Sequence, residues 1–408
     1  MPPATTLERV HLPGNAASLA AAGGEGPVYA LCGRPDIGQR DAVDLGGGLL
    51  CAVDLDGALR WSREVVWGAD LRVSPDGGIW FIDRRVLCEV GPDGTPGRRI
   101  EPDGALPEEM LGAFVILDDG FLVAWGSQPY RGVRVERLDG EGKRRWSTEL
   151  PVPGLSYRGV VEMRIGDSQS MRPMRPWTPT SMLVEGREGL LVSGDRALAT
   201  FLDYSSGIGL SHCLDVDTGE HLWTTPPMPT GDRAIAGPGS FYIGAQGYGA
   251  FEMSLYDRDG RVVLQWPSHG RPLVSSRGRT RVIELENVLP SRSRVRRLHR
   301  DASMTDGPVL PGYYTAGPVL SSDGRAAFFR DGRLQTVDPD LNVRTLHTAE
   351  GWEGTGRMLL LDGGLLAFTL TQDWKVGSRF FFARTDLAPI DTGVWPCGEG
   401  NLRGNPVR

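Results

Sequence analysis

The chain of 408 residues contains few cysteines, few histidines and no excess of positive charge. Its five cysteines lie far apart and form no CxxC pair, so we expect neither a disulfide framework nor a zinc site. The formal net charge of -7 argues against a nucleic-acid binder, which needs a basic surface. The six histidines are scattered, and only His212 and His221 have a spacing that would bring them together across a turn.

Long apolar runs and catalytic motifs are also missing. No apolar stretch reaches the length of a membrane-spanning helix, so no membrane association is expected. The N-terminus lacks the basic start and apolar run of a signal peptide, which predicts a cytoplasmic protein. A periplasmic or secreted location is the alternative if a signal peptide has been removed. The sequence contains no Walker loop, nucleophile elbow or HExxH motif, and we expect no metal and no cofactor.

Turn-forming residues are abundant instead, with 56 glycines and 30 prolines, which is more than a helical protein tolerates. One pattern recurs: a short apolar strand, an Asp-rich turn, and a second strand that often ends in Trp. The clearest copies are Leu50–Trp61, Val135–Trp146, Cys213–Trp223 and Leu255–Trp266. Each copy predicts a β-hairpin, because Asp and Gly favour tight turns and the flanking residues alternate as strands do.

Weaker copies extend the pattern along the chain. The equivalent turn positions are Asp54, Gly91, Asp139, Asp215, Asp257, Asp301, Asp338 and Asp386. Most of these turns follow one another at about 40 residues, the length of a four-stranded unit, and a further hairpin precedes each one. The interval between Asp139 and Asp215 is too long for one unit, which indicates an insertion at about 153–178.

The repeat resembles that of the pyrroloquinoline-quinone (PQQ)-type, or quinoprotein-type, β-propellers. Their repeat has an apolar strand, Asp, a Gly-Lys turn and a closing Trp, and Gly142-Lys-Arg-Arg-Trp146 matches it best. The resemblance implies that Trp61, Trp146, Trp223 and Trp266 pack between neighbouring blades. The enzymes of that family hold their quinone with two adjacent cysteines, which this chain lacks, so the resemblance is to a non-enzymatic branch.

We therefore predict an all-β fold: a single closed β-propeller over residues 1–408, with eight four-stranded antiparallel blades. Seven blades are the alternative. Both termini are expected to take part in closing the ring, with the N-terminal strand around 16–22 completing the last blade. The tail from Val394 onward, with its Trp-Pro and Gly-Asn pairs, resembles the seam of PQQ-type propellers.

The long connections of the predicted blades fall mainly on one face. This face carries the loops that join the second strand to the third and the fourth strand to the next blade. Aromatic and arginine side chains are typical of interface hot spots, and loops on a rigid scaffold often carry function. The candidate partner-binding residues are Trp67, Tyr130, Arg131, Arg172, Arg175, Trp177, Tyr204, Tyr248, Trp352 and Trp374.

A second candidate surface is basic. Arg292, Arg294 and Arg296 alternate along a predicted strand and would share one of its faces. They predict either a solvated strand or a docking stripe for an acidic partner or polyanion.

These features favour a non-enzymatic scaffold that binds a protein partner through the face with the long loops. Two alternatives stay open at this point. One is a propeller enzyme, a lyase or hydrolase with its site at the mouth of the central channel. The other is an inactive PQQ-type protein that binds a small molecule.

Overall fold

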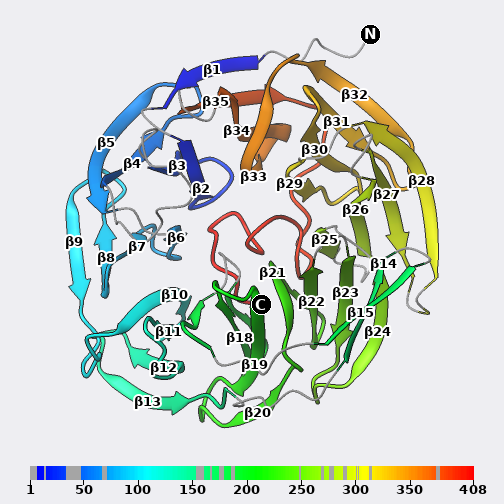
Figure 1. The fold of residues 1–408 in the computed structure, drawn as a ribbon. Coiled ribbons are helices and arrows are strands. Elements are labelled where there is room, and N and C mark those ends of the chain that lie inside the picture. The colour runs from blue at the N-terminus through cyan, green and yellow to red at the C-terminus, as the bar shows by residue number, and fades with distance from the viewer. Residues whose placement is uncertain are drawn as a thin grey trace. The chain divides into compact units, whose positions relative to one another are not determined.

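The computed structural model describes residues 7–12, 15–33, 47–66, 71–152, 160–165, 168–173, 179–184, 189–247, 250–267, 271–274, 280–287, 292–299, 301, 303–311, 315–373 and 377–408. Within these residues the fold is all-β, and the one helical element is the short 3-10 turn η1 (Asp362–Gly364). The strands form four-stranded antiparallel groups, the form taken by the blades of a β-propeller (Figure 1). The predicted all-β class is confirmed.

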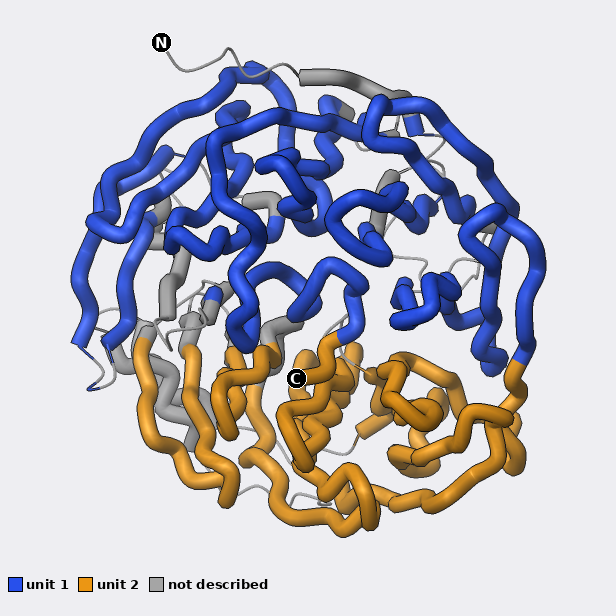
Figure 2. Tube along the Cα trace, turned by 180° about the vertical axis from the view of Figure 1, so that it is seen from behind, with its two compact units in different colours: residues 1–99, 270–405 blue, residues 100–269, 406–408 orange. Residues whose placement is uncertain are grey.

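Two compact units make up the chain (Figure 2). Unit 1 contains residues 1–99 and 270–405, and unit 2 contains residues 100–269 and 406–408. Each unit is described below by itself.

Unit 1 begins with two four-stranded sheets in chain order. They are β2 (Asn15–Ala21), β3 (Val28–Gly33), β4 (Gly47–Val53) and β5 (Leu59–Val66), followed by β6 (Leu71–Val73), β7 (Ile79–Asp83), β8 (Val86–Val90) and β9 (Pro96–Ile100).

The later part of unit 1 adds three further groups of strands. They are β25 (Arg271–Val274), β26 (Thr280–Asn287), β27 (Arg292–Leu298) and β28 (Met304–Pro311); β29 (Thr315–Leu320), β30 (Ala326–Arg330), β31 (Arg333–Val337) and β32 (Val343–Thr348); and β33 (Glu353–Leu361), β34 (Leu365–Asp373), β35 (Gly377–Arg384) and β1 (Leu7–His11). A single parallel pair, Gly317 with Arg357, joins the last two groups into one eight-stranded sheet.

Unit 2 contains three groups and a separate hairpin. The groups are β10 (Glu109–Leu117), β11 (Gly120–Ser127), β12 (Arg134–Asp139) and β13 (Arg144–Glu149); β16 (Leu183–Val184), β17 (Leu190–Ser193), β18 (Arg196–Asp203), β19 (Ile208–Asp215) and β20 (His221–Thr224); and β21 (Met228–Gly237), β22 (Ser240–Gly247), β23 (Ala250–Tyr256) and β24 (Val262–Pro267). The hairpin, β14 (Val160–Ile165) with β15 (Ser168–Pro173), falls where the sequence indicated an insertion.

The Asp-rich turns join the third and fourth strands of their sheets. In the first of them, the amide of Gly57 donates to the carbonyl of Asp54 over 2.9 Å, and Gly57 has a φ of 90°. Glycine reaches this left-handed conformation without a Cβ clash, which explains its place in the motif. Seven of the eight predicted hairpins are confirmed: their turns lie between β4–β5, β8–β9, β12–β13, β19–β20, β23–β24, β27–β28 and β31–β32.

The hairpin predicted at Asp386 is wrong, and so is the predicted place of the N-terminal strand. The chain does not turn back after β35, whose free edge pairs antiparallel with β1, from Leu7 opposite Ala383 to His11 opposite Arg379. The strand predicted around 16–22 is instead β2, which pairs with β3 in the first sheet. A hydrogen-bonding edge accepts any strand of suitable length, so local sequence does not reveal which segment fills it.

The C-terminal segment lies against several first strands of unit 1. Its backbone bonds to β2 through Ala21, to β6 through Val73 and to β29 through Leu320, at 2.7–2.9 Å. From β33, the buried Arg357 guanidinium donates to the carbonyl oxygens of Gly398, Asn401 and Leu402. The Glu399 carboxylate lies 3.7 Å from Arg357 and 3.5 Å from Arg72, both buried. This segment thus replaces the water contacts of these inner groups with hydrogen bonds.

Tryptophan side chains link consecutive sheets within each unit. The Nε1 of Trp61 in β5 donates to the carbonyl of Pro92 in the next sheet over 2.9 Å. Trp146 and Trp223 in unit 2 reach Val216 and Arg258 in the same way, at 3.2 Å and 3.0 Å. A structural role is therefore confirmed for these three residues. Trp266 is buried and packs edge-to-face on Tyr242.

Candidate partner-binding site

Half of the predicted partner-binding residues lie outside the described residues. These are Trp67, Arg175, Trp177, Tyr248 and Trp374. Arg172 is placed by its backbone only, in β15 opposite Val161. Tyr130, Arg131, Tyr204 and Trp352 are described in full.

The structure brings three of these four into neighbouring loops of unit 2. Tyr130 and Arg131 lie in the loop between β11 and β12, and Tyr204 lies in the loop between β18 and β19. The side chain of Arg131 is exposed, and that of Tyr204 is 61% exposed. Tyr130 is half-buried and packs against the core of unit 2, and this burial raises the pKa of its phenol. We call the two loops that carry these three residues the tyrosine loops.

A short segment between β15 and β17 ties the two loops together. The amide of Tyr130 donates to the carbonyl of Thr180 over 2.9 Å, and Ser127 and Met182 exchange backbone hydrogen bonds at 2.8 Å and 3.0 Å. The Thr180 hydroxyl lies 2.9 Å from the Ser205 hydroxyl, beside Tyr204. Because one segment bonds to both loops, the two tyrosines are carried on a common support.

A buried carboxylate fixes the second of the tyrosine loops. Asp203 has no exposed surface, and its Oδ1 accepts from Ser205 N and Oγ, at 3.3 Å and 2.9 Å, and from Ser181 Oγ at 3.2 Å. Its Oδ2 accepts from Ser206 Oγ at 2.8 Å. A buried carboxylate needs such donors to offset its desolvation. Sequence reasoning did not single out Asp203, although the Asp-x-Ser-Ser spacing is a signal for a turn of this kind.

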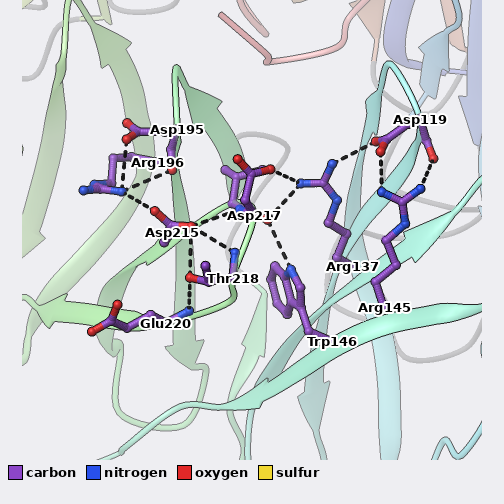
Figure 3. A network of polar contacts seen from close by, with 11 residues as sticks. Asp119, Arg137, Arg145, Trp146, Asp195, Arg196, Asp215, Asp217, Thr218 and Glu220 are labelled. Carbon is purple, nitrogen blue, oxygen red and sulfur yellow. Dashed lines mark hydrogen bonds and ion pairs between the residues drawn. The ribbon is translucent and has the colours of Figure 1, made fainter.

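Polar contacts at the other end of the same sheets link them (Figure 3). Arg137 of β12 donates to the carbonyl of Val216 and to Asp217, both over 2.9 Å, and to Asp119 over 2.8 Å. Arg145 also binds Asp119, and Asp215 accepts from the Thr218 amide over 2.9 Å, the main cause that lowers the pKa of Asp215. These contacts reduce the freedom of the sheets that carry the tyrosine loops.

Trp352 is placed differently from the tyrosine loops. It is buried in unit 1 with 7% exposure and packs edge-to-face on Phe381 at a centroid distance of 5.2 Å. The guanidinium of Arg379 lies 5.2 Å from the centre of its ring. The ring of Trp352 therefore belongs to the core of unit 1, and little of it is available to a partner.

The predicted basic stripe lies on β27, an interior strand of its sheet. Arg294 and Arg296 share the carboxylate of Asp306 in β28, at 3.3 Å and 2.8 Å. Arg292 is placed by its backbone, opposite Pro311 of β28. Asp306 offsets part of the positive charge of the stripe. A role of the stripe in docking stays a prediction.

The two histidines singled out by their spacing do meet. Nδ1 of His212 and Nε2 of His221 lie 2.9 Å and 2.8 Å from the hydroxyl of Thr224. Burial, together with a smaller effect of the nearby His221, lowers the pKa of His212 to about 3. Across the described ranges, no three His, Cys, Asp or Glu side chains gather as metal ligands would. Nor do those ranges contain a helix long and apolar enough to span a membrane.

Comparisons with known proteins do not assign a family. No family model and no curated protein matches the chain. Solved structures that resemble it include virginiamycin B lyase from Staphylococcus aureus, with 11% identity, a TM-score of 0.44, and 93% of this chain and 99% of that one covered.

Two further structures are of named propeller types. The Pan2 WD40 domain of Neurospora crassa has 10% identity and a TM-score of 0.44, covering 93% of this chain and 91% of its own. The β-propeller domain of the Trilobed protease from Pyrococcus furiosus has 10% identity and a TM-score of 0.41, covering 71% and 86%. Values this low carry no argument about what this chain does.

Proposed function

We propose that this chain is a non-enzymatic β-propeller that binds a protein partner through the face carrying its long loops. The observation that supports this most is the pair of tyrosine loops in unit 2. Two phenol rings and a guanidinium, with Tyr204 and Arg131 exposed, lie on loops that one segment supports. Tyr and Arg are the residues most often found at interface hot spots, and a supported loop loses little entropy on binding.

The scaffold in this proposal is a closed ring of eight blades of PQQ-like type. The described strands form eight groups, seven of four strands and one, β16–β20, of five, which supports eight blades over the alternative of seven. The pairing of β1 with β35 supplies the last group with its fourth strand from the opposite end of the chain. This pairing is what closure by the N-terminus requires. The Trp contacts between consecutive sheets support the likeness to the PQQ-type repeat.

The C-terminal segment bears on the enzyme alternative. An active site at a channel mouth needs open space beside the first strands of the blades. In unit 1 the C-terminal segment bonds to four of these strands, β2, β6, β29 and β33, and so occupies part of the space beside them. This placement supports a scaffold more than an enzyme.

The test begins with affinity capture from the native host and continues with the purified partner. We expect Tyr204→Ala and Arg131→Ala to weaken binding about tenfold or more each, as truncated hot-spot residues do. Val263→Ala is the matched control, because Val263 is also 61% exposed in unit 2 but lies on β24, away from the loops. All three variants should keep the melting temperature of the parent protein. Equal binding by Tyr204→Ala and Val263→Ala would refute the proposed face.

A further inference from the structure

A crevice of about 390 Å³ opens in unit 1 between β5 and the sheet of β6–β9. Pockets that hold small molecules commonly measure about 300–1,000 Å³. The crevice lies between two consecutive sheets of unit 1, none of its lining residues belongs to the tyrosine loops, and the proposed function makes no use of it.

Apolar side chains form the floor of the crevice. Val65 of β5 faces Phe81, Cys88 and Val90 of the neighbouring sheet, and all four are buried in one core cluster. Phe81 and Cys88 are direct partners in the β7–β8 register, so their side chains share one face. This floor favours a ligand with an apolar body.

Two arginines from the facing sheets stand beside this floor. Arg63 lies two residues before Val65 on β5, so both side chains point to the same face of the strand. Arg63 donates to the carbonyl of Gly94 over 3.1 Å. Among the described residues it forms no ion pair. Arg99 of β9 lies 3.5 Å from Asp83 in a pair with 62% and 22% of the two side chains exposed, so solvent screens their attraction.

The two glutamates along the crevice point elsewhere. Glu89 lies between Cys88 and Val90, so strand alternation turns its side chain to the opposite face of the sheet. There it accepts from Arg98 over 2.9 Å, and Arg98 in turn lies 5.0 Å from the centre of the Trp80 ring. Glu64 lies between Arg63 and Val65 on β5, so its side chain also points to the opposite face of its strand. Two guanidiniums and one carboxylate, Asp83, therefore face the crevice, which leaves one excess positive charge.

We infer that this crevice binds a small organic monocarboxylate whose apolar body is an aromatic ring or short hydrocarbon chain. The carboxylate lies between Arg63 and Arg99, which present planar donors suited to it, and the apolar body covers Phe81 and Val65. The inference concerns a small-molecule site and is independent of the protein partner proposed above.

The first test uses 1-naphthylacetate as the probe with the full chain, by calorimetric titration and thermal shift. We expect a dissociation constant on the order of 1 mM or tighter, the affinity that a ligand of this size reaches. The neutral 1-naphthylacetamide keeps the apolar body, and acetate keeps only the charge; both should bind at least about tenfold more weakly. Binding of the amide as tight as that of the acid would overturn the inference, and so would no binding of the acid.

The second test uses neighbouring arginines on the two faces of β9. Arg99→Gln should weaken 1-naphthylacetate about tenfold, because one charge-assisted hydrogen bond is lost, and Arg63→Gln should do the same. Arg98→Gln is the matched control, since Arg98 lies next to Arg99 in the chain but on the opposite face with Glu89. Arg99 is largely exposed, so its variant is expected to fold even if that of Arg63 does not. Equal weakening by Arg98→Gln and Arg99→Gln would mean that the crevice is not the site.

Discussion

One contact in each unit fills the space between two consecutive sheets at the equivalent place in the repeat. The two contacts differ in which of the two sheets supplies the large side chain. In unit 2, Trp146 on the fourth strand of one sheet packs on Gly219 in the turn of the next, where an added Cβ would lie 2.6 Å from the indole ring. In unit 1, the turn of β31–β32 carries Leu341 at the glycine position, and Gly307 of β28 lies opposite it, its added Cβ 3.1 Å from that of Leu341.

The comparison shows what the repeat requires at this position. One large side chain must fill the space between two sheets, and the residue facing it must be small, because protein interiors are close-packed. Which sheet supplies the large side chain is secondary. The inverted pair has its own cost, since Leu341 adopts a φ of 67°, a conformation that strains residues with a Cβ.

Removing the indole from the contact in unit 2 should have the largest effect. Trp146→Ala loses the packing on Gly219 and the hydrogen bond to Val216, and we expect it to lower the free energy of unfolding by about 3 kcal/mol. Urea denaturation measures the change. Trp146→Phe retains most of the ring and should lose about 1 kcal/mol. Equal losses for the two variants would show that the aromatic packing contributes little.

The inverted contact in unit 1 predicts an unusual order of two substitutions. Leu341→Gly loses a buried side chain but relieves the left-handed strain, so the net loss should be about 2 kcal/mol. Leu341→Ala loses nearly the same packing and keeps the strain, so it should be less stable than Leu341→Gly by about 1 kcal/mol. Urea denaturation of both variants decides this. If alanine proves the more stable, the backbone of Leu341 is not strained and the two contacts are not inversions of one another.

The inverted contact also shows where prediction from sequence succeeds. The seven hairpin turns follow from Asp and Gly, whose backbone preferences act within four residues. The Trp contacts follow from a repeated residue at a fixed spacing. The contact of Leu341 with Gly307 was not predicted, because the two residues come from different sheets and neither belongs to the repeated motif.

The candidate site was predictable to a similar degree. The loop positions of Tyr130, Arg131 and Tyr204 were predicted correctly, because loops after buried strands can be located from the pattern of apolar residues, and their role in binding stays a prediction. The burial of Trp352 was not predictable, since Gly351-Trp-Glu353 reads as an exposed turn and its neighbour Phe381 comes from another strand. The pairing of β1 with β35 left no local trace either, because backbone hydrogen bonds carry no sequence signature.

Acid should weaken unit 2 through the strand that carries Trp223. His221 precedes Trp223 on β20, and the buried His212 lies beside it on β19, with a folded pKa of about 3 against an ordinary value of 6.5. Between pH 6.5 and about pH 3, the unfolded chain therefore binds a proton at His212 that the folded chain does not bind. The free energy of unfolding is not reduced by this histidine above pH 6.5, and it decreases as the pH falls from 6.5 towards 3. We expect a loss of about 1 kcal/mol by pH 5.5. Urea denaturation at pH 7.5 and pH 5.5 measures this loss. His212→Gln should remove most of the difference between the two pH values. His299→Gln in unit 1 is the control for the loss of a histidine elsewhere. An unchanged difference in the His212 variant would show that acid does not act on unit 2 through this pair.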